Sequence, residues 1–289
     1  LGAEYLAGVG YDPQKMLDVV GILKDQEAFE LRKAQQEGRQ PRVYHGLFAT
    51  HPRNDARLQE VIRAADRYRL EDPREVDQGE FLGMLDGMAF GSSEDQGILQ
   101  GNAFYHKPLN LFMAFPEGWK VQNRPTSLLS VSPDQEQAIL VVLYSRGEAP
   151  TPEQFLRKHF SGLRQGRSID SDSYTAIAVD QSNDNKAPVR VSATFHGDKV
   201  LVLQGVGKSA LPDDAVLETE RSIRELKPDE VKIASGNRIR LTRARPGDTF
   251  AALAARSALD RYAEDQLRLL KGMYPDGEPA PGQLIKVIE

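Results

Sequence analysis

The chain has 289 residues, of which 40% are hydrophobic and 27% are charged, an ordinary globular composition. At about 100–200 residues per domain this length accommodates two or three domains. The formal net charge of -5 provides no overall basic field for nucleic acid or anionic lipid, and no apolar run approaches the ~20 residues that span a membrane. The absence of cysteine excludes disulfides, thiolate zinc ligands and a cysteine nucleophile.

Residues 1–75 are predicted to be mainly helical. A first helix ends at Gly8, and a second begins at Asp12-Pro13, because aspartate accepts N–H bonds at an N-cap and proline suits the first helical position. A loop then leads to a third helix over about residues 53–69. The second helix carries apolar residues at helical spacing: Met16, Val19, Val20, Leu23, Ala28 and Leu31.

Residues 76–230 are predicted to form an α+β sandwich, with helices packed on a mostly antiparallel sheet. After a short helix near Phe81, the hydrophobic pattern changes to that of strands from Gly97 onward. Thr151 and Pro152 are suited to the N-cap and first position of a helix. The predicted strands are 98–105, 109–115, 127–131, 138–144, 174–179, 189–195 and 200–206, with helices at 152–163 and 212–225.

Residues 236–289 are predicted to form a third, small unit with the order β-α-α-β. A strand over 238–242 precedes a turn in which Asp248 or Thr249 caps a helix. A second helix and a strand over 282–287 follow.

Three separate stretches resemble known families. The stretch from Leu1 to Pro13, together with Thr50-His51-Pro52 and Arg57, resembles the back half of an M48-type zinc metalloprotease domain of the bacterial periplasmic subgroup. The stretch from Leu111 to Trp119 resembles the opening hairpin of a PsbP/Mog1-type sandwich. The last unit resembles a LysM module in Gly247-Asp248-Thr249-Phe250 and Pro281-Gly282-Gln283-Leu284, but it has Lys271-Gly272 where that family usually has Asn-Gly.

These resemblances imply a multidomain α+β chain. Its expected parts are C-terminal helices of a zincin peptidase domain (1–75), an α+β sandwich (76–230) and a LysM-like βααβ module (236–289). An M48 domain binds zinc through HExxH, in which two histidines are ligands and the glutamate is the base. This chain has no HExxH. By the resemblance, the third ligand lies just upstream of Leu1, and Glu4 is one turn too late to replace it. We therefore expect no catalytic residue and no bound zinc in this chain, and zinc in the full-length protein.

His51 and Arg57 are the two candidate site residues. In the resembled family, a histidine in the His-Pro segment fills the open zinc position and holds the enzyme inactive; the alternative is that His51 only sets the start of the third helix. The resemblance places Arg57 at the active-site cleft; the alternative is a surface salt bridge. His45 is expected to be a solvated loop residue. The three other histidines, which lack ligand spacing, are expected to be structural or surface residues: His106, His159 and His196.

Two functions remain open from the sequence. The first is a fragment of a periplasmic zinc endopeptidase that acts on misfolded or misassembled envelope proteins, with outer-membrane assembly proteins as further partners. The second is a non-catalytic envelope scaffold that recognises a protein partner or peptidoglycan. A test for HExxH upstream of Leu1 distinguishes them.

Overall fold

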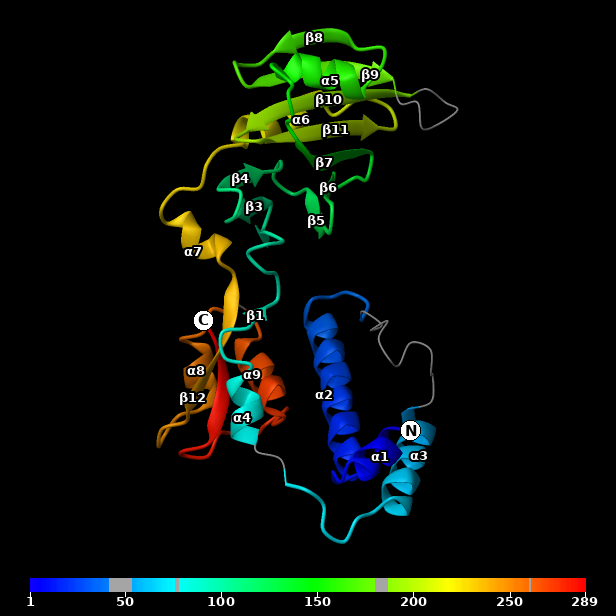
Figure 1. Ribbon diagram of the computed structural model, residues 1–289, viewed down its shortest axis with the longest axis vertical. Helices are drawn as coiled ribbons and strands as arrows, with labels where there is room; N and C mark the ends of the chain where they lie inside the picture. Colours follow the sequence, from blue (N-terminus) through cyan, green and yellow to red (C-terminus); the bar gives the residue numbers. More distant parts are fainter. Residues whose placement is uncertain (42–53, 76–77, 180–186, 260) are drawn as a thin grey trace. The chain divides into compact units, whose positions relative to one another are not determined.

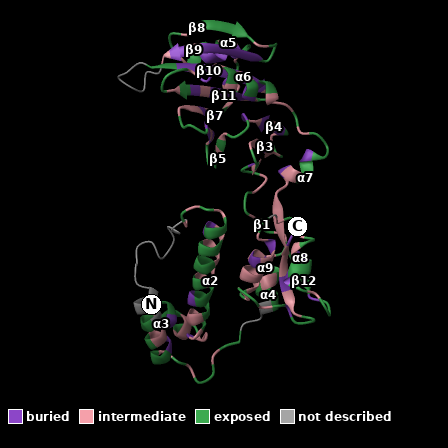
Figure 2. Ribbon diagram, turned by 180° about the vertical axis from the view of Figure 1, so that it is seen from behind, coloured by how far each residue is buried: buried purple, intermediate pink, exposed green. Residues whose placement is uncertain are grey.

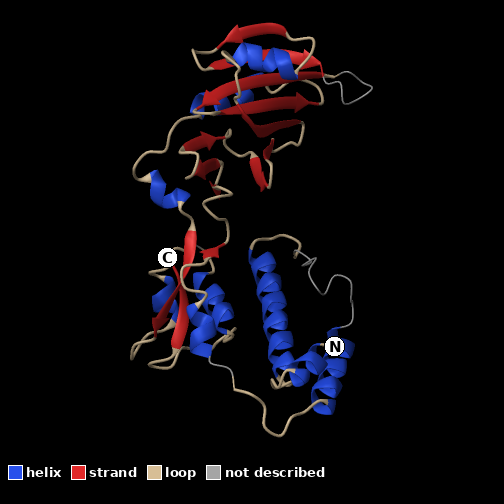
Figure 3. Cartoon of the chain, viewed as in Figure 1, coloured by secondary structure: helices blue, strands red, loops and turns tan. Residues whose placement is uncertain are grey.

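The computed structural model describes residues 1–41, 54–75, 78–179, 187–259 and 261–289. They form two compact units: unit 1 comprises 1–88 and 238–289, and unit 2 comprises 89–237. The fold class is α+β with antiparallel sheets, as predicted (Figures 1 and 3). No helix within the described ranges is long and apolar enough to cross a bilayer.

The N-terminal part of unit 1 consists of helices α1 (Gly2–Gly8), α2 (Lys15–Gln36) and α3 (Asn54–Arg67), which confirms the three predicted helices. The predicted start of the second helix at Asp12-Pro13 was wrong, because α2 begins at Lys15 with Gln14 as its N-cap. Both α1 and α2 pack against α3. Asp12 Oδ1 accepts a hydrogen bond from Gln14 N at 2.9 Å, so this side chain orders the turn that leads into α2.

The apolar stripe on α2 is only partly covered. Val20 is buried, whereas Val19 and Leu31 are 48% and 51% exposed. The predicted helix is therefore present, but part of its apolar stripe is exposed. Helical spacing identifies which side chains share a face, but it does not determine which neighbours cover that face.

The rest of unit 1 consists of α4 (Gln78–Gly83), β12 (Asn237–Arg243), α8 (Phe250–Ala254), α9 (Ala263–Lys271) and β13 (Leu284–Ile288). The predicted order β-α-α-β is confirmed, and β12 pairs antiparallel with β13. Thr249 Oγ1 accepts a hydrogen bond from Ala252 N at 3.1 Å and so caps α8. The core of this part is fully buried: Phe250, Leu267, Ile285 and Ile288.

Helix α2 contacts helix α9, although more than two hundred residues separate them. The Phe29 ring meets the Tyr262 ring edge-on at 6.0 Å between centroids. Arg32 Nη1 lies 3.4 Å from Asp265 Oδ1. Unit 1 thus joins the first and third of the predicted ranges through an aromatic contact and an ion pair.

Unit 2 contains two complete sheets, one small and one large. A three-stranded sheet has the order β2-β3-β4, and a seven-stranded sheet has the order β5-β6-β7-β11-β10-β9-β8. The strands are β1 (Ala89–Phe90), β2 (Ile98–Gln100), β3 (Ala103–His106), β4 (Leu111–Ala114), β5 (Lys120–Arg124), β6 (Ser127–Val131), β7 (Gln137–Ser145), β8 (Arg164–Ser168), β9 (Ser173–Val179), β10 (Pro188–His196) and β11 (Lys199–Gly207), and the helices are α5 (Pro152–His159), α6 (Asp213–Ser222) and α7 (Glu230–Ala234).

The two faces of the seven-stranded sheet have separate cores. Helix α5 covers β9 and β10 on one face, where Phe155 and Leu156 pack against Val191. Helix α6 lies on the other face, where Val216 packs against Leu203. The central strands β10 and β11 are the most heavily buried part of the unit (Figure 2). The predicted Thr151 cap is confirmed, because Thr151 Oγ1 accepts from Gln154 N at 3.2 Å.

Within the three-stranded sheet β2-β3-β4 and the seven-stranded sheet, the strand predictions were wrong in three places. The predicted strand 98–105 is a hairpin, because Gly101-Asn102 forms a tight turn with a positive φ of 63° at Gly101. The edge strands β5 and β8 were not predicted. Almost every residue in them is exposed, so neither strand shows the apolar alternation that identifies a half-buried strand.

Candidate ligand-binding groove

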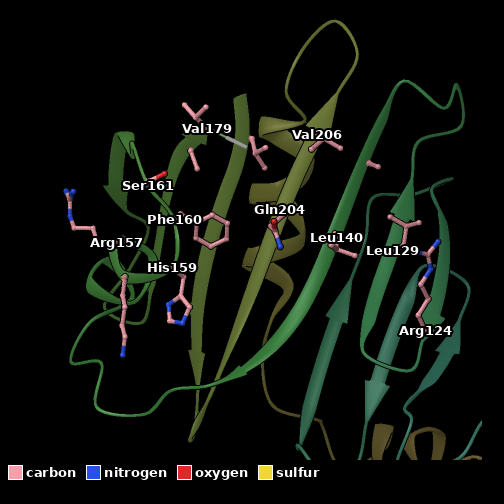
Figure 4. A pocket seen from close by; sticks show the side chains of 14 residues that line it. Arg124, Leu129, Leu140, Arg157, His159, Phe160, Ser161, Val179, Gln204 and Val206 are labelled. Atoms are coloured by element: carbon pink, nitrogen blue, oxygen red, sulfur yellow. The ribbon is translucent and has the colours of Figure 1, made fainter. Parts of the chain in front are cut away.

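A groove of about 650 Å³ opens on the face of the seven-stranded sheet that carries α5 (Figure 4). Helix α5 covers only the β9–β10 part of this face, so the neighbouring strands form an uncovered floor. The groove is lined by Arg124, Leu129, Ala138, Leu140, Arg157, Lys158, His159, Phe160, Ser161, Ala178, Val179, Val189, Gln204 and Val206.

The floor is built by strand alternation. In β7 and β11, Leu140 pairs with Gln204 and Ala138 pairs with Val206, so these four side chains share one face. The residues between them, such as Ile139, point into the core on the α6 side. The floor is therefore apolar apart from the amide of Gln204.

Basic side chains stand at two places on the rim. Arg124 ends strand β5, and its pairing with Ser127 places it on the groove face, where its Nη2 donates to Gln122 Oε1 at 3.0 Å. Arg157 and Lys158 lie in the last turn of α5. Glu153 pairs with Arg157 at 2.7 Å and offsets part of that charge, but none of the residues lining the groove is acidic.

His159 forms part of one wall of the groove. Its ring stacks on Phe155 with centroids 4.2 Å apart, and Nδ1 donates to the Phe155 carbonyl at 2.8 Å. Both contacts are within α5, so the wall position depends on how firmly α5 is docked. The groove thus combines an apolar floor with positive charge at its rim, an arrangement suited to non-covalent binding of a partly apolar, partly anionic ligand.

The predicted site residues fall largely outside the described residues. His45 and His51 lie in the range 42–53, which is outside the described residues. Arg57 belongs to α3, but the position of its side chain is not described. Their proposed roles stay predictions. His106 and His196 form hydrogen bonds with the backbone of Leu109, at 3.3 Å and 2.8 Å, and burial lowers the pKa of His106.

The described side chains do not fit a zinc site. Within the described ranges, no group of three or more histidine, aspartate and glutamate side chains is arranged to hold a metal ion. We therefore derive no catalytic step through zinc from these residues.

Sequence reasoning missed the groove, although one signal was present. Residues 138–143 are apolar at every position, whereas a strand with one solvated face alternates. An apolar run of this kind indicates that both faces of the strand are apolar. In β7 one of them faces the core and the other forms the floor of the groove.

Comparisons with known proteins found weak structural similarity only. No family model and no curated protein matches the chain. A crystal structure from Bacteroides thetaiotaomicron VPI-5482 aligns with 14% identity and a TM-score of 0.35, over 46% of this chain and 51% of that one. The solution structure of cyanobacterial PsbP (CyanoP) from Synechocystis sp. PCC 6803 aligns with 12% identity and a TM-score of 0.33, over 48% of this chain and 98% of that one. The chain thus spans about half the length of the first of these structures.

Proposed function

We propose that this chain recognises unfolded or misassembled polypeptides in the bacterial envelope. The observation that carries the proposal is the open groove, whose apolar floor lies across the sheet beside basic side chains. Unfolded chains expose apolar side chains that folded proteins bury, so an exposed apolar groove distinguishes the two states.

The enzymatic context of this proposal comes from the sequence. We propose that the chain is the substrate-handling part of an M48-type periplasmic zinc endopeptidase, in which zinc-activated water would cleave the bound polypeptide. Residues 1–75 would then be peptidase helices, and exposed apolar side chains such as Tyr5 and Val19, 68% and 48% exposed, would face the peptidase half. Unit 2 would be a PsbP/Mog1-like sandwich, and the end of the chain a LysM-like module.

A charge placed in the groove floor tests the binding function. We expect Val206→Asp to abolish most binding of fluorescently labelled casein, an unfolded acidic polypeptide. The new carboxylate repels the acidic ligand, and its hydration makes the floor unfavourable for apolar side chains. The matched control is Leu143→Asp. Leu143 is 42% exposed and Val206 45% exposed, but Leu143 lies on the opposite face of the same sheet.

Fluorescence anisotropy of the labelled casein measures both variants against the unchanged chain. Retained binding in Leu143→Asp with loss in Val206→Asp supports the groove. Equal binding by the two variants, with both folded as judged by circular dichroism, would contradict the proposal.

The alternative is a non-catalytic scaffold that binds peptidoglycan through the C-terminal unit. The feature that favours it is the β-α-α-β order with Thr249 capping α8. This function predicts that the whole chain co-sediments with purified peptidoglycan. If the chain fails to co-sediment under conditions in which a LysM protein does, the proposed binding to peptidoglycan is contradicted.

A further inference from the structure

We infer that the ligand of the groove is an extended polypeptide segment with an apolar centre and an acidic group at each end. This inference rests on the proposed function, because it specifies which polypeptides the groove selects. It is carried by the separation of the basic side chains, by the length of the floor and by the lack of acidic lining residues.

The positive charge is divided between the two ends of the groove. Figure 4 shows Arg124 at one end and Arg157 with His159 at the other, with Val206 and Leu140 between them. Lys158 follows Arg157 in α5 and adds a second cation to that end. A ligand that satisfies both ends needs two separated anionic groups.

The length of the floor fits a short extended segment. Arg124 stands on β5, and the strands that follow it across the sheet are β6, β7, β11 and then β10, where the cover of α5 with Arg157 begins. Strands lie about 4.8 Å apart, so four spacings cover about 19 Å, and an extended chain at about 3.3 Å per residue crosses this distance with about six residues. A segment of this length places its flanking residues near the two basic ends.

A single-headed amphiphile such as a fatty acid matches the groove less well. Its one anionic group can pair with only one end, which leaves the other cations facing an apolar tail. A polypeptide carries side chains along its whole length and can therefore meet both ends at once. Because the cations are partly exposed, we expect them to determine selectivity more than overall affinity.

Three labelled peptides test this inference on the complete chain. Each has blocked termini and the same apolar centre of about six residues. The first carries aspartate at both ends, the second aspartate at one end and lysine at the other, and the third lysine at both ends. We expect the peptide with two aspartates to bind about tenfold more tightly than the peptide with two lysines. Salt at about 500 mM should reduce this difference in affinity, because it screens the charges.

Reversing the charge at one end of the groove tests whether Arg124 determines the preference for acidic peptides. We expect Arg124→Glu to weaken binding of the peptide with two aspartates several-fold. The same variant should bind the peptide with one aspartate and one lysine more tightly than the peptide with two aspartates. The matched control is Arg221→Glu, which makes the same charge change at an exposed position on α6, on the other face of the sheet. This control should leave the order of the three peptides unchanged.

The outcomes separate this inference from the proposed function. If casein binds through Val206 but the three peptides bind equally, the inference fails and the proposed function stands. If neither casein nor any peptide binds, both fail. If oleate or phosphatidylglycerol vesicles bind in a manner that depends on Val206 and Arg124 while no peptide binds, the ligand is a lipid and the inference is overturned.

Discussion

Replacing Leu156 with alanine is expected to lower the free energy of unfolding of unit 2 by about 2–5 kcal/mol. Leu156 is 0% exposed and belongs to the core between α5 and the sheet, beside Phe155 and Val191. Its truncation removes apolar burial and leaves a cavity that close packing cannot fully fill. The loss should also reach the groove, since α5 supplies its basic end and its His159 wall.

Urea titration followed by Trp119 fluorescence measures this effect. Trp119 is the single tryptophan of the chain and packs against a core cluster of unit 2, so its emission reports on this unit. The control is Arg157→Ala at the next position. The Arg157 side chain is 57% exposed and forms a salt bridge within α5, so its removal should lower the free energy of unfolding by about 1 kcal/mol or less. If Leu156→Ala proved as stable as the unchanged chain, the docking of α5 described here would be incorrect.

Glu220→Gln is expected to remove a pH dependence from the stability of unit 2. Glu220 belongs to α6 and is 3% exposed, and its carboxyl contacts Ser192 and Thr194 of β10, the latter at 3.2 Å. Burial raises the pKa of Glu220 to about 7 from an ordinary value of 4.5, the nearby Asp170 carboxylate adds to this, and the two hydroxyls oppose it.

The direction of the effect follows from proton binding. Between about pH 4.5 and pH 7 the Glu220 carboxyl is protonated in the folded state but ionised in the unfolded state. The free energy of unfolding therefore falls as pH rises through this range, and the contribution of Glu220 is constant above about pH 7. The fall attributable to Glu220 is about 3 kcal/mol over this range. Glutamine is neutral at every pH, so the variant should gain stability relative to the unchanged chain as pH rises.

Urea titrations of both proteins near pH 5 and near pH 8, read from Trp119, provide the measurement. Glu230 does not interfere, because its hydrogen bonds with Arg224 lower its pKa to about 2 and its own stabilising contribution is lost only as pH falls towards that value. A stability difference between the two proteins that is the same at both pH values would contradict the raised pKa of Glu220.

Much of the local structure could be predicted from sequence because its causes are local. Thr151 and Thr249 cap helices through hydrogen bonds to residues three positions later. The hairpin turn at 196–199 follows from glycine, since Gly197 has a φ of 59°. Strand β10 was recognisable because its apolar residues alternate with polar ones, and strand β11 because residues 200–203 form a continuous apolar run.

The candidate site could not be predicted, since its residues come from distant parts of the chain. Arg124 and Arg157 belong to the same groove only because β6, β7 and β11 stand in that order between β5, which carries Arg124, and the part of the sheet that α5 covers. Nothing in the local sequence around either arginine specifies this order. The pairing of Glu220 with Ser192 and the contact of Phe29 with Tyr262 are likewise products of packing.

The sequence by itself determined the positions of most helices and strands, their caps and turns, and which face of each element is apolar, because these depend on residues a few positions apart. Only the tertiary structure decided the strand order, the uncovered part of the sheet and the charges gathered at its two ends. The physical reason is that hydrophobic burial is non-directional: the pattern of apolar residues demands a partner for each face, but it does not specify which distant element provides it.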